Sequence, residues 1–554
     1  MKRILLFSIP ILLLACSRSG TDTIEETTTI EFPRITTTVV SGIAVTVASS
    51  GGDNIDDGGG KILEKGVCWS ISTDPTIEND FTAEGSGAST FSSTLTNLSP
   101  NTKYFLRSYA TNEKGTAYGD ELVFTTLAKP VVVFEGDLIL LTQVEVDDFG
   151  MQGYTKVTGN LSINTTGAIA TDITNLEGLK ELTEIGGSLL VSNNDGLENI
   201  DGLSNLSVVG ANITVEENDA LINIDGLSNI SSVVINITVF QNAALMNIDG
   251  LGKIQSILGS VRISLNDSLS NINGLVNLKT IGNGIAIGTG ISIGGNNALT
   301  SLDGLNNVSG SVGNLSIVDN DALTNINAIN QLTSILKQLN IRKNKSLIAI
   351  GGLQKLTSIG GEFYLGENDA LSSIEGLNQL QSIGGLLSIT GNTALTNFNA
   401  LNKLLSIGGE LTFANNPSLT TIGGLNVLSS LGGGLVVLNN DLLLNLDGLN
   451  QLMSAEGDVM VFGNDALLNV DGLGSCSTVG GTVRVDTNDA LTNIDGLNML
   501  TSVMGNINVS RNLELRDLCG LQSILNIGFG GNYYVEDNFY NPSRQDIEIG
   551  NCRI

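Results

Sequence analysis

The chain has 554 residues, with 26 basic and 56 acidic side chains, no histidine and a formal net charge of −30. This acidity opposes sequence-independent binding to nucleic acid, because such binding needs Lys and Arg to displace counterions. The absence of histidine excludes Ser-His-Asp and Cys-His catalysis and every His-ligated metal site.

The first 15 residues have the pattern of an export signal. Lys2 and Arg3 precede an apolar stretch that ends in the sequence LLAC at 13–16 and is too short to span a bilayer as a helix. This ending resembles the lipobox of bacterial lipoproteins, and the resemblance implies cleavage before Cys16 and a diacylglycerol on its sulfur. An ordinary secretory signal with an incidental Cys is the alternative. We therefore expect a signal peptide over 1–15 and an anchor in the cell envelope, in the outer membrane and on either of its faces.

Residues 16–31 are rich in Ser, Thr and Glu and are expected to form a flexible tether. Residues 32–128 then alternate between short apolar runs and Gly-rich turns, which predicts a β-sandwich. The sequence LSPNTKY at 98–104 resembles a fibronectin type III domain. In that family Trp69 would be the buried tryptophan and Tyr104 the corner tyrosine. Such modules are usually spacers, and we expect that role here.

From residue 129 to about residue 530 the chain is dominated by a 24-residue repeat, aligned on tripeptides such as Asp-Gly-Leu at 201–203. One six-residue insertion, around 283–289, interrupts it. Seven residues before the tripeptide stands an Asn in fourteen copies: Asn194, Asn218, Asn242, Asn266, Asn296, Asn320, Asn344, Asn368, Asn392, Asn416, Asn440, Asn464, Asn488 and Asn512. Periodicity of this kind predicts a solenoid.

The repeat from Ile383 to Leu401 shows how one turn is built. Leu387 and Ile389 alternate as residues of a strand do and point inward, while Phe398 supplies a further core contact. The pattern resembles leucine-rich repeats and, more closely, the receptor L domain, whose units also read I-x-G-x-L-x-I before an Asn. The resemblance implies a mainly β fold: a long right-handed parallel β solenoid over 129–530 with an N-terminal cap, and a C-terminal cap over 531–554.

The Asn column is expected to be structural. Where the chain leaves the strand, backbone groups need new partners, and a stacked Asn amide offers both donors and an acceptor.

Two acidic columns invite a metal hypothesis. One lies at or next to the residue after the Asn, and the other opens the tripeptide, as at Asp201, Asp225 and Asp249. Calcium could bridge such carboxylates, but Asp is also a common turn residue, and no spacing matches an EF-hand or a glycine-rich calcium repeat. We expect no cofactor, with calcium as the alternative.

The outward positions of the strands are mostly small and polar. Val436, Leu438, Met460 and Phe462 differ, and they should form one exposed apolar cluster on adjacent turns. Two interpretations stay open: a ligand-binding surface, or a surface covered by a loop or by the aromatic C-terminal segment. We take these four residues as the candidate ligand-binding site.

Cysteines give one further expectation. Cys519 and Cys552 bracket the C-terminal segment, and in an exported protein this arrangement predicts a disulfide that closes the last turn. Cys476 replaces a core Leu or Ile of other repeats and should be buried.

These features favour a non-enzymatic, lipid-anchored envelope protein that binds a protein or glycan through the solenoid face. Receptor L domains bind protein ligands or serve as adhesive ectodomains, so the resemblance points the same way. A purely structural envelope component is the first alternative. A carbohydrate-active enzyme is the second, since some β-solenoids cleave polysaccharides with Asp, Lys and Arg. It is disfavoured because the insertion that would have to shape a pocket carries no charge.

Overall fold

The computed structural model describes residues 29–164, 173–231, 235–282 and 289–554. The chain divides into two compact units, Met1–Pro130 and Val131–Ile554. Cys16, the predicted signal peptide and most of the predicted tether lie outside the described residues, as does the insertion at 283–288. The predicted mainly β class is confirmed, with an antiparallel sandwich first and long parallel sheets after it.

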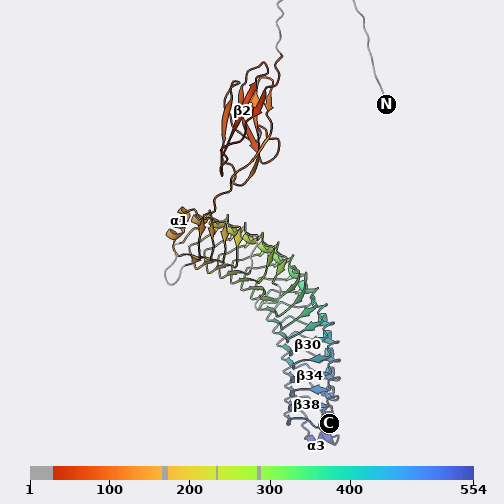
Figure 1. Cartoon of the computed structure of the whole chain (residues 1–554). Helices are drawn as coiled ribbons and strands as arrows, with labels where there is room; N and C mark the ends of the chain where they lie inside the picture. The colour runs from red at the N-terminus through yellow and green to blue at the C-terminus, as the bar shows by residue number, and fades with distance from the viewer. Residues whose placement is uncertain (1–28, 165–172, 232–234, 283–288) are drawn as a thin grey trace, which may run out of the picture. The chain divides into compact units, whose positions relative to one another are not determined.

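The first unit contains two antiparallel sheets (Figure 1). One sheet contains β1 (Arg34–Thr37), β2 (Ala48–Asp56) and β5 (Phe91–Leu95). The other contains β3 (Glu64–Ser70), β4 (Asp80–Phe81), β6 (Lys103–Thr111), β7 (Thr116–Tyr118) and β8 (Leu122–Thr125). Trp69 and Tyr104 are both buried in the core of this unit. The Ser99 N–H donates to the Tyr104 hydroxyl over 3.0 Å, which is the contact of a tyrosine corner.

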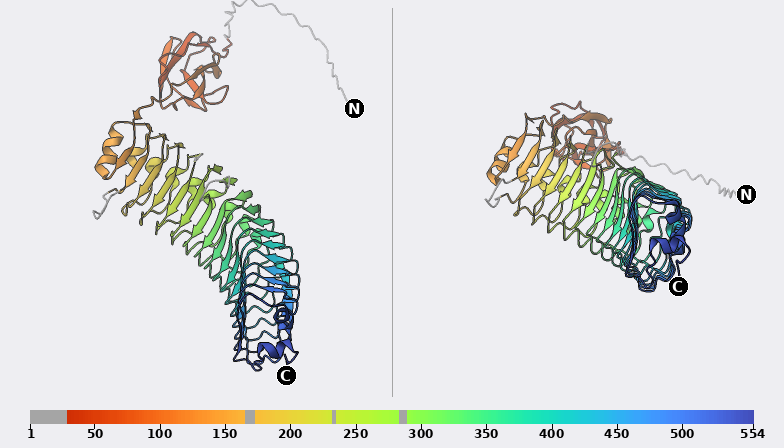
Figure 2. Two further views of the ribbon diagram at one scale, coloured as in Figure 1. Left: turned by 60° about the horizontal axis from the view of Figure 1, so that its bottom comes forward. Right: turned by 90° about the horizontal axis from the view of Figure 1, so that it is seen from below.

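The second unit is a stack of turns, each adding one strand to a long parallel sheet (Figures 1 and 2). We call this the main sheet. Its strands, in spatial order, are β10 (Leu138–Leu140), β12 (Leu161–Asn164), β14 (Leu189–Ser192), β16 (Ile213–Glu216), β17 (Ile237–Phe240), β19 (Ser260–Ser264), β21 (Gly290–Gly294), β23 (Asn314–Val318), β25 (Leu339–Arg342), β27 (Phe363–Gly366), β29 (Leu387–Thr390), β31 (Leu411–Ala414), β33 (Leu435–Leu438), β35 (Val459–Phe462), β37 (Val483–Asp486), β39 (Ile507–Ser510) and β40 (Tyr533–Glu536).

A second set of short parallel strands borders most of the described turns on another side. They are β9 (Val133–Phe134), β11 (Lys156–Val157), β13 (Glu184–Ile185), β15 (Val208–Val209), β18 (Ser256–Ile257), β20 (Thr280–Ile281), β22 (Gly310–Val312), β24 (Leu332–Ile335), β26 (Ser358–Ile359), β28 (Ser382–Ile383), β30 (Ser406–Ile407), β32 (Ser430–Leu431), β34 (Ser454–Ala455), β36 (Thr478–Val479) and β38 (Ser502–Val503). Each of them except β9 contributes a buried residue, such as Ile383 or Ile407, to the core.

The repeated tripeptide forms a single 3₁₀ turn in most repeats. These turns are η1 (Glu177–Leu179), η2 (Asp201–Leu203), η3 (Asp225–Leu227), η4 (Asp249–Leu251), η5 (Asn273–Leu275), η6 (Asp303–Leu305), η7 (Asn327–Ile329), η8 (Gly351–Leu353), η9 (Asn399–Leu401), η10 (Gly423–Leu425), η11 (Asp447–Leu449), η12 (Asp471–Leu473), η13 (Asp495–Leu497) and η14 (Cys519–Leu521). A Cβ at Gly226 would lie 1.9 Å from the carbonyl oxygen of Ile200, so the stacked turns approach too closely there for a side chain without a backbone shift. Ala328 and Ala400 hold the same position, which shows that a methyl group can be accommodated when the neighbouring turn adjusts.

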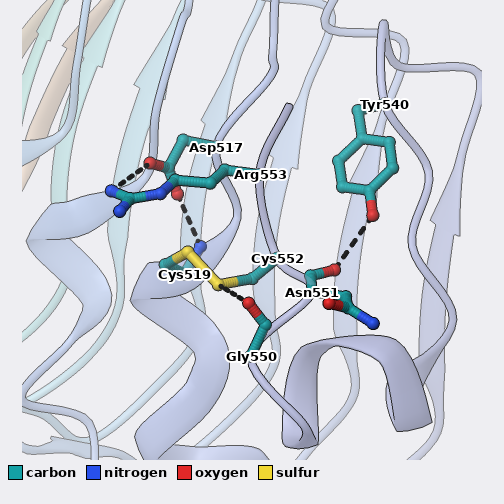
Figure 3. The surroundings of a disulfide bond; sticks show 7 residues. All are labelled: Asp517, Cys519, Tyr540, Gly550, Asn551, Cys552 and Arg553. Atoms are coloured by element: carbon teal, nitrogen blue, oxygen red, sulfur yellow. Dashed lines mark hydrogen bonds and ion pairs between the residues drawn. A yellow bond between two sulfur atoms is a disulfide. The ribbon is translucent and has the colours of Figure 1, made fainter.

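Helices close both ends of the stack. Helix α1 (Gln143–Met151) buries Val146 and Phe149 at the first turns, and α2 (Gln522–Ile527) and α3 (Arg544–Glu548) lie at the last. In the C-terminal segment Cys519 and Cys552 form a disulfide across 33 positions of sequence (Figure 3). Beside it, Asp517 accepts the Cys519 N–H over 2.9 Å and pairs with Arg553 at 3.8 Å.

Candidate functional site

The Asn column forms a continuous hydrogen-bonded ladder inside the solenoid. In a typical turn, Asn218 donates through its backbone N–H and its Nδ2 to Oδ1 of Asn242, at 3.2 and 3.0 Å. The same Nδ2 also donates to the Val191 carbonyl of the preceding turn at 3.1 Å. Every Asn of the column is fully buried. The ladder therefore satisfies backbone groups at each turn, which is a structural role and leaves the amides no free donor for a ligand.

The ladder continues beyond the fourteen positions that the repeat reveals. Asn512 donates to Oδ1 of Asn538 at 3.0 Å, and Asn538 in turn donates to Oδ1 of Asn541 at 2.9 Å. The spacing from Asn512 to Asn538 is 26 residues instead of 24, so a strict period misses it. Asn538 and Asn541 are two of the four Asn in residues 531–554, and nothing in the sequence distinguishes them from the others.

The residue just before each ladder Asn adopts the left-handed conformation. Gly, Asn or Asp occupies many of these positions, but Leu265 (φ 58°) and Thr487 (φ 55°) do not have a side chain that favours it. Sequence analysis missed this column, although its frequent Gly and Asn are the signal that would have revealed it.

The four candidate residues lie together on the outer face of the main sheet. Val436 pairs in register with Met460, and Leu438 with Phe462, on β33 and β35. Val436 is only 9% exposed, less than the prediction assumed, because the side chains of Thr412 and Met460 flank it on the neighbouring strands. Leu438, Met460 and Phe462 are partly exposed. We call these four residues the apolar patch.

The C-terminal segment does not lie over the apolar patch. It supplies β40, which pairs with β39 and is separated from β35 by β37 and β39. At about 4.8 Å per strand, this places β40 roughly 14 Å away along the sheet. Its outward Tyr534 is 47% exposed. The sequence left open whether a loop or the C-terminal segment covers these four residues. Within the described residues, the C-terminal segment does not.

A buried carboxylate with two arginines borders the patch on β37. Asp486 is 1% exposed, and both Arg484 and Arg511 donate to it. The Arg484 guanidinium also lies 5.1 Å from the centre of the Phe462 ring. Burial by itself would raise the pKa of Asp486, but the hydrogen bonds from Arg511, Arg484 and Thr487 outweigh it and lower the pKa to about 2. Asp486 is thus ionised at neutral pH and holds Arg484 against Phe462.

The acidic columns behave as stacked, mutually repelling charges. Burial and the carboxylates of Asp249 and Asp201 raise the pKa of Asp225, and burial, Asp517 and Asp471 do the same for Asp495. Among the described residues, no group of three or more His, Cys, Asp or Glu side chains is placed to hold a metal ion.

A shallow groove runs along the short strands. It encloses about 480 Å³ and is lined chiefly by the repeated Ser, Ile and Gly of β26 to β32, with Glu456 at one end. Cys68 and Cys476 are buried free thiols, and burial raises the pKa of both, so neither is poised as a nucleophile. In the described part of the chain, no helix has the length and hydrophobicity needed to cross a membrane.

Comparison with families of known proteins gives one match, in the solenoid. The family model for the receptor L domain matches residues 154–250, at the start of the solenoid, so these turns resemble that family. No curated protein sequence matches the chain.

Three solved structures were found to be similar over part or most of the chain. A human fibronectin type III domain, from fibronectin type III domain containing protein 3, is 19% identical, with 18% of this chain and 90% of that chain covered and a TM-score of 0.14. Another, derived from the human KIAA0970 protein, is 20% identical, with 21% and 91% covered and a TM-score of 0.16. Pectate lyase PelI from Erwinia chrysanthemi, in complex with tetragalacturonic acid, is 9% identical, with 81% and 85% covered and a TM-score of 0.13. Scores this low support no conclusion about function.

Proposed function

We propose that this chain is a non-enzymatic envelope protein that binds a partner through the outer face of its main sheet. The observation that carries the proposal is the apolar patch, where Leu438, Met460 and Phe462 are partly exposed on adjacent strands. Soluble proteins seldom expose contiguous apolar surface without using it. Phe462 is the proposed anchor, since aromatic side chains dominate binding energy at interfaces.

The contrast between the two faces of the sheet supports a binding role. Inward positions are apolar and buried along the repeats, as at Leu435 and Val459. Outward positions carry side chains of different kinds, such as the small polar Thr412 and the charged Arg484. A constant frame that presents a variable surface suits recognition. The partner is a protein or a glycan of the cell surroundings.

Anchoring by lipid at Cys16 is part of the same proposal and rests on the sequence LLAC at 13–16. The substitution Cys16→Ser should block lipid attachment, lower the mass of the mature protein and release it from membranes. Wild-type protein that is recovered without detergent and carries no lipid would contradict the anchor.

Binding is tested by presenting the purified chain to arrays of glycans and extracellular-matrix proteins. Phe462→Ser should abolish binding to whichever partner is found while leaving the melting temperature nearly unchanged. Phe240→Ser is the matched control, because Phe240 is also an outward strand residue with an arginine, Arg262, 4.3 Å from its ring. Loss of binding in both variants, or a large drop in stability for Phe462→Ser alone, would contradict the assignment of the site.

A purely structural envelope component is the alternative. It predicts that the wild-type chain binds nothing on the arrays and that Phe462→Ser behaves as wild type in cells.

A further inference from the structure

Two carboxylates border the apolar patch where its strands begin. Side chains alternate along a strand, so Asp458 lies on the same outer face as Met460 and Phe462, and Glu410 lies on that face two strands away. Both are exposed. Gly434 stands between them on β33's approach, and a Cβ there would lie 2.7 Å from the Asp458 carbonyl oxygen. Gly434 is itself buried, so the neighbouring strands approach closely at this point and no side chain stands between the two carboxylates.

The opposite border of the patch does not offset this negative charge. Arg484 and Arg511 share the buried carboxylate of Asp486. Asp486, Glu410 and Asp458 together are three carboxylates against these two guanidinium groups, so the charge around the patch is about −1, in keeping with the acidic net charge of −30 for the chain.

We infer that the apolar patch binds a protein segment that presents a Lys or Arg next to a hydrophobic side chain. The hydrophobic side chain packs on Leu438, Met460 and Phe462, and the cation lies at the strand starts, between the exposed carboxylates of Glu410 and Asp458. Those two residues are two strands apart, about 10 Å at the backbone, and flexible carboxylate side chains can close on one cation from both sides. This inference rests on the proposed function and names the class of its partner.

The composition of the patch favours a protein over a glycan. Sugars bind most readily to an open aromatic face, and the ring of Phe462 already has the Arg484 guanidinium 5.1 Å from its centre. The remaining members, Val436, Leu438 and Met460, are aliphatic or thioether side chains, which pack well against hydrophobic side chains of a partner. The buried carboxylate of Asp486 is paired with Arg484 and Arg511. Glu410 accepts a hydrogen bond from the Thr412 hydroxyl, and Asp458 accepts one from the Thr482 N–H; both donors are neutral, so these two carboxylates keep their charge for a cationic partner.

The test uses the purified full chain and three fluorescent ten-residue peptides. One alternates Lys and Leu, the second alternates Glu and Leu, and the third alternates Lys and Ser. Binding of the Lys–Leu peptide should weaken about fivefold in the double variant Glu410→Gln/Asp458→Asn, as expected for two exposed ion pairs. It should weaken about 30-fold in Phe462→Ser, as expected for a central aromatic anchor. Asp458→Asn keeps the acceptor that the Thr482 N–H uses at 2.7 Å, so the double variant should fold.

The matched control is Glu362→Gln. Glu362 occupies the same strand-start position two turns before Glu410 and is also exposed, but it does not border the patch, so its variant should bind like wild type. Equal weakening by Glu362→Gln would show non-specific attraction to an acidic protein and overturn the inference.

Other outcomes separate this inference from the proposed function. Preferential binding of the Glu–Leu peptide, or of an oligogalacturonate used as an acidic glycan probe, would overturn the cationic partner while leaving the patch as a binding surface. If Phe462→Ser weakens binding but the double variant does not, Glu410 and Asp458 are not part of the site. Binding of neither Leu-containing peptide would refute the inference, and an unchanged array profile for Phe462→Ser would refute the proposed function as well.

Discussion

The two faces of the main sheet differ in what their side chains do. On the inner face, every turn repeats the same arrangement: Phe413, for example, is fully buried and its ring centre lies 4.7 Å from that of Phe398. On the outer face, Phe462 sits at the end of β35 partly exposed, with an arginine against its ring. Two phenylalanines in the same sheet therefore have different surroundings: one is packed between turns of the core, and the other is partly exposed beside an arginine.

The difference shows that the two faces of the solenoid are under different packing constraints. Each turn contacts mainly its neighbours, so inward residues must complete the core locally and tolerate little change. Outward residues contribute little to that core and can vary. Substitutions on each face test this difference.

The largest effect is expected for a cavity in the core. Phe413→Ala should lower the free energy of unfolding by about 3–5 kcal/mol, because the site cannot collapse around the lost ring. Phe462→Ala on the outer face should cost about 1 kcal/mol or less. Denaturant unfolding of both variants checks this, and similar losses would mean that the outer face is as tightly packed as the core.

The disulfide gives the next largest effect. A double Cys519→Ser/Cys552→Ser variant removes a loop closure of 33 positions and should destabilise the C-terminal turns by about 3–4 kcal/mol in the loop-entropy model. Hydrogen exchange should show the loss concentrated near α2 and β40, with the first turns unchanged. Adding reductant to wild type should reproduce the effect, and adding it to the variant should do nothing.

A substitution in the buried Asn ladder tests the inner face at a polar position. Asn392→Ala removes the donor to the Leu365 carbonyl and the acceptor for Asn368, and should cost about 1–3 kcal/mol because buried groups are left unpaired. Thr390→Ala, two residues away on the outer face, should cost about 0.5 kcal/mol or less. Equal shifts in melting temperature would mean that the inside and outside of the turn have been assigned the wrong way round.

The main features of the solenoid were predictable because the same pattern of apolar residues and Asn recurs in every repeat. The inward columns and the Asn ladder follow from periodicity and from the need to pair buried backbone groups. The closure at Asn538 and Asn541 was not predictable, since it breaks the period, nor was the left-handed backbone at Leu265 and Thr487, which local propensity opposes.

The candidate site was less predictable than the frame. The repeat places Val436 on the outer face but says nothing of how far its neighbours cover it. The pairing of Asp486 with Arg511 joins two turns through side-chain geometry, and no spacing within one repeat reveals it. Outer-face properties of this kind depend on which side chains meet across strands, and sequence alone gives that only where the register is already known.

Titration of Asp486 tests the border of the patch. Its folded pKa is lowered to about 2, below the unfolded value of about 3.9, so it stabilises the fold above pH 4, and this contribution is lost as the pH falls from 4 to 2. At pH 7 the contribution is roughly 2 kcal/mol. Wild type and Asp486→Asn should therefore differ most near neutral pH and converge near pH 2. A difference that is constant with pH would show that the carboxylate is not ionised against Arg484 and Arg511.

The smallest effect is expected where the solenoid stacks like charges at an exposed position. Burial and the carboxylates of Asp249 and Asp201 raise the pKa of Asp225 in the folded chain. A raised pKa has the opposite sign to the case of Asp486: the ionised group opposes folding at neutral pH, and the penalty is relieved as the pH falls through the folded pKa. Asp225→Asn should therefore stabilise the chain slightly at pH 7, by less than about 0.5 kcal/mol, and the gain should shrink in acid.

Calcium at millimolar concentration should change the stability of neither the variant nor the wild type, because the described residues gather no metal-binding group there. A calcium-dependent gain seen only in the wild type would show that the stacked carboxylates hold the ion, and that this acidic column is a binding site instead of a row of turn residues.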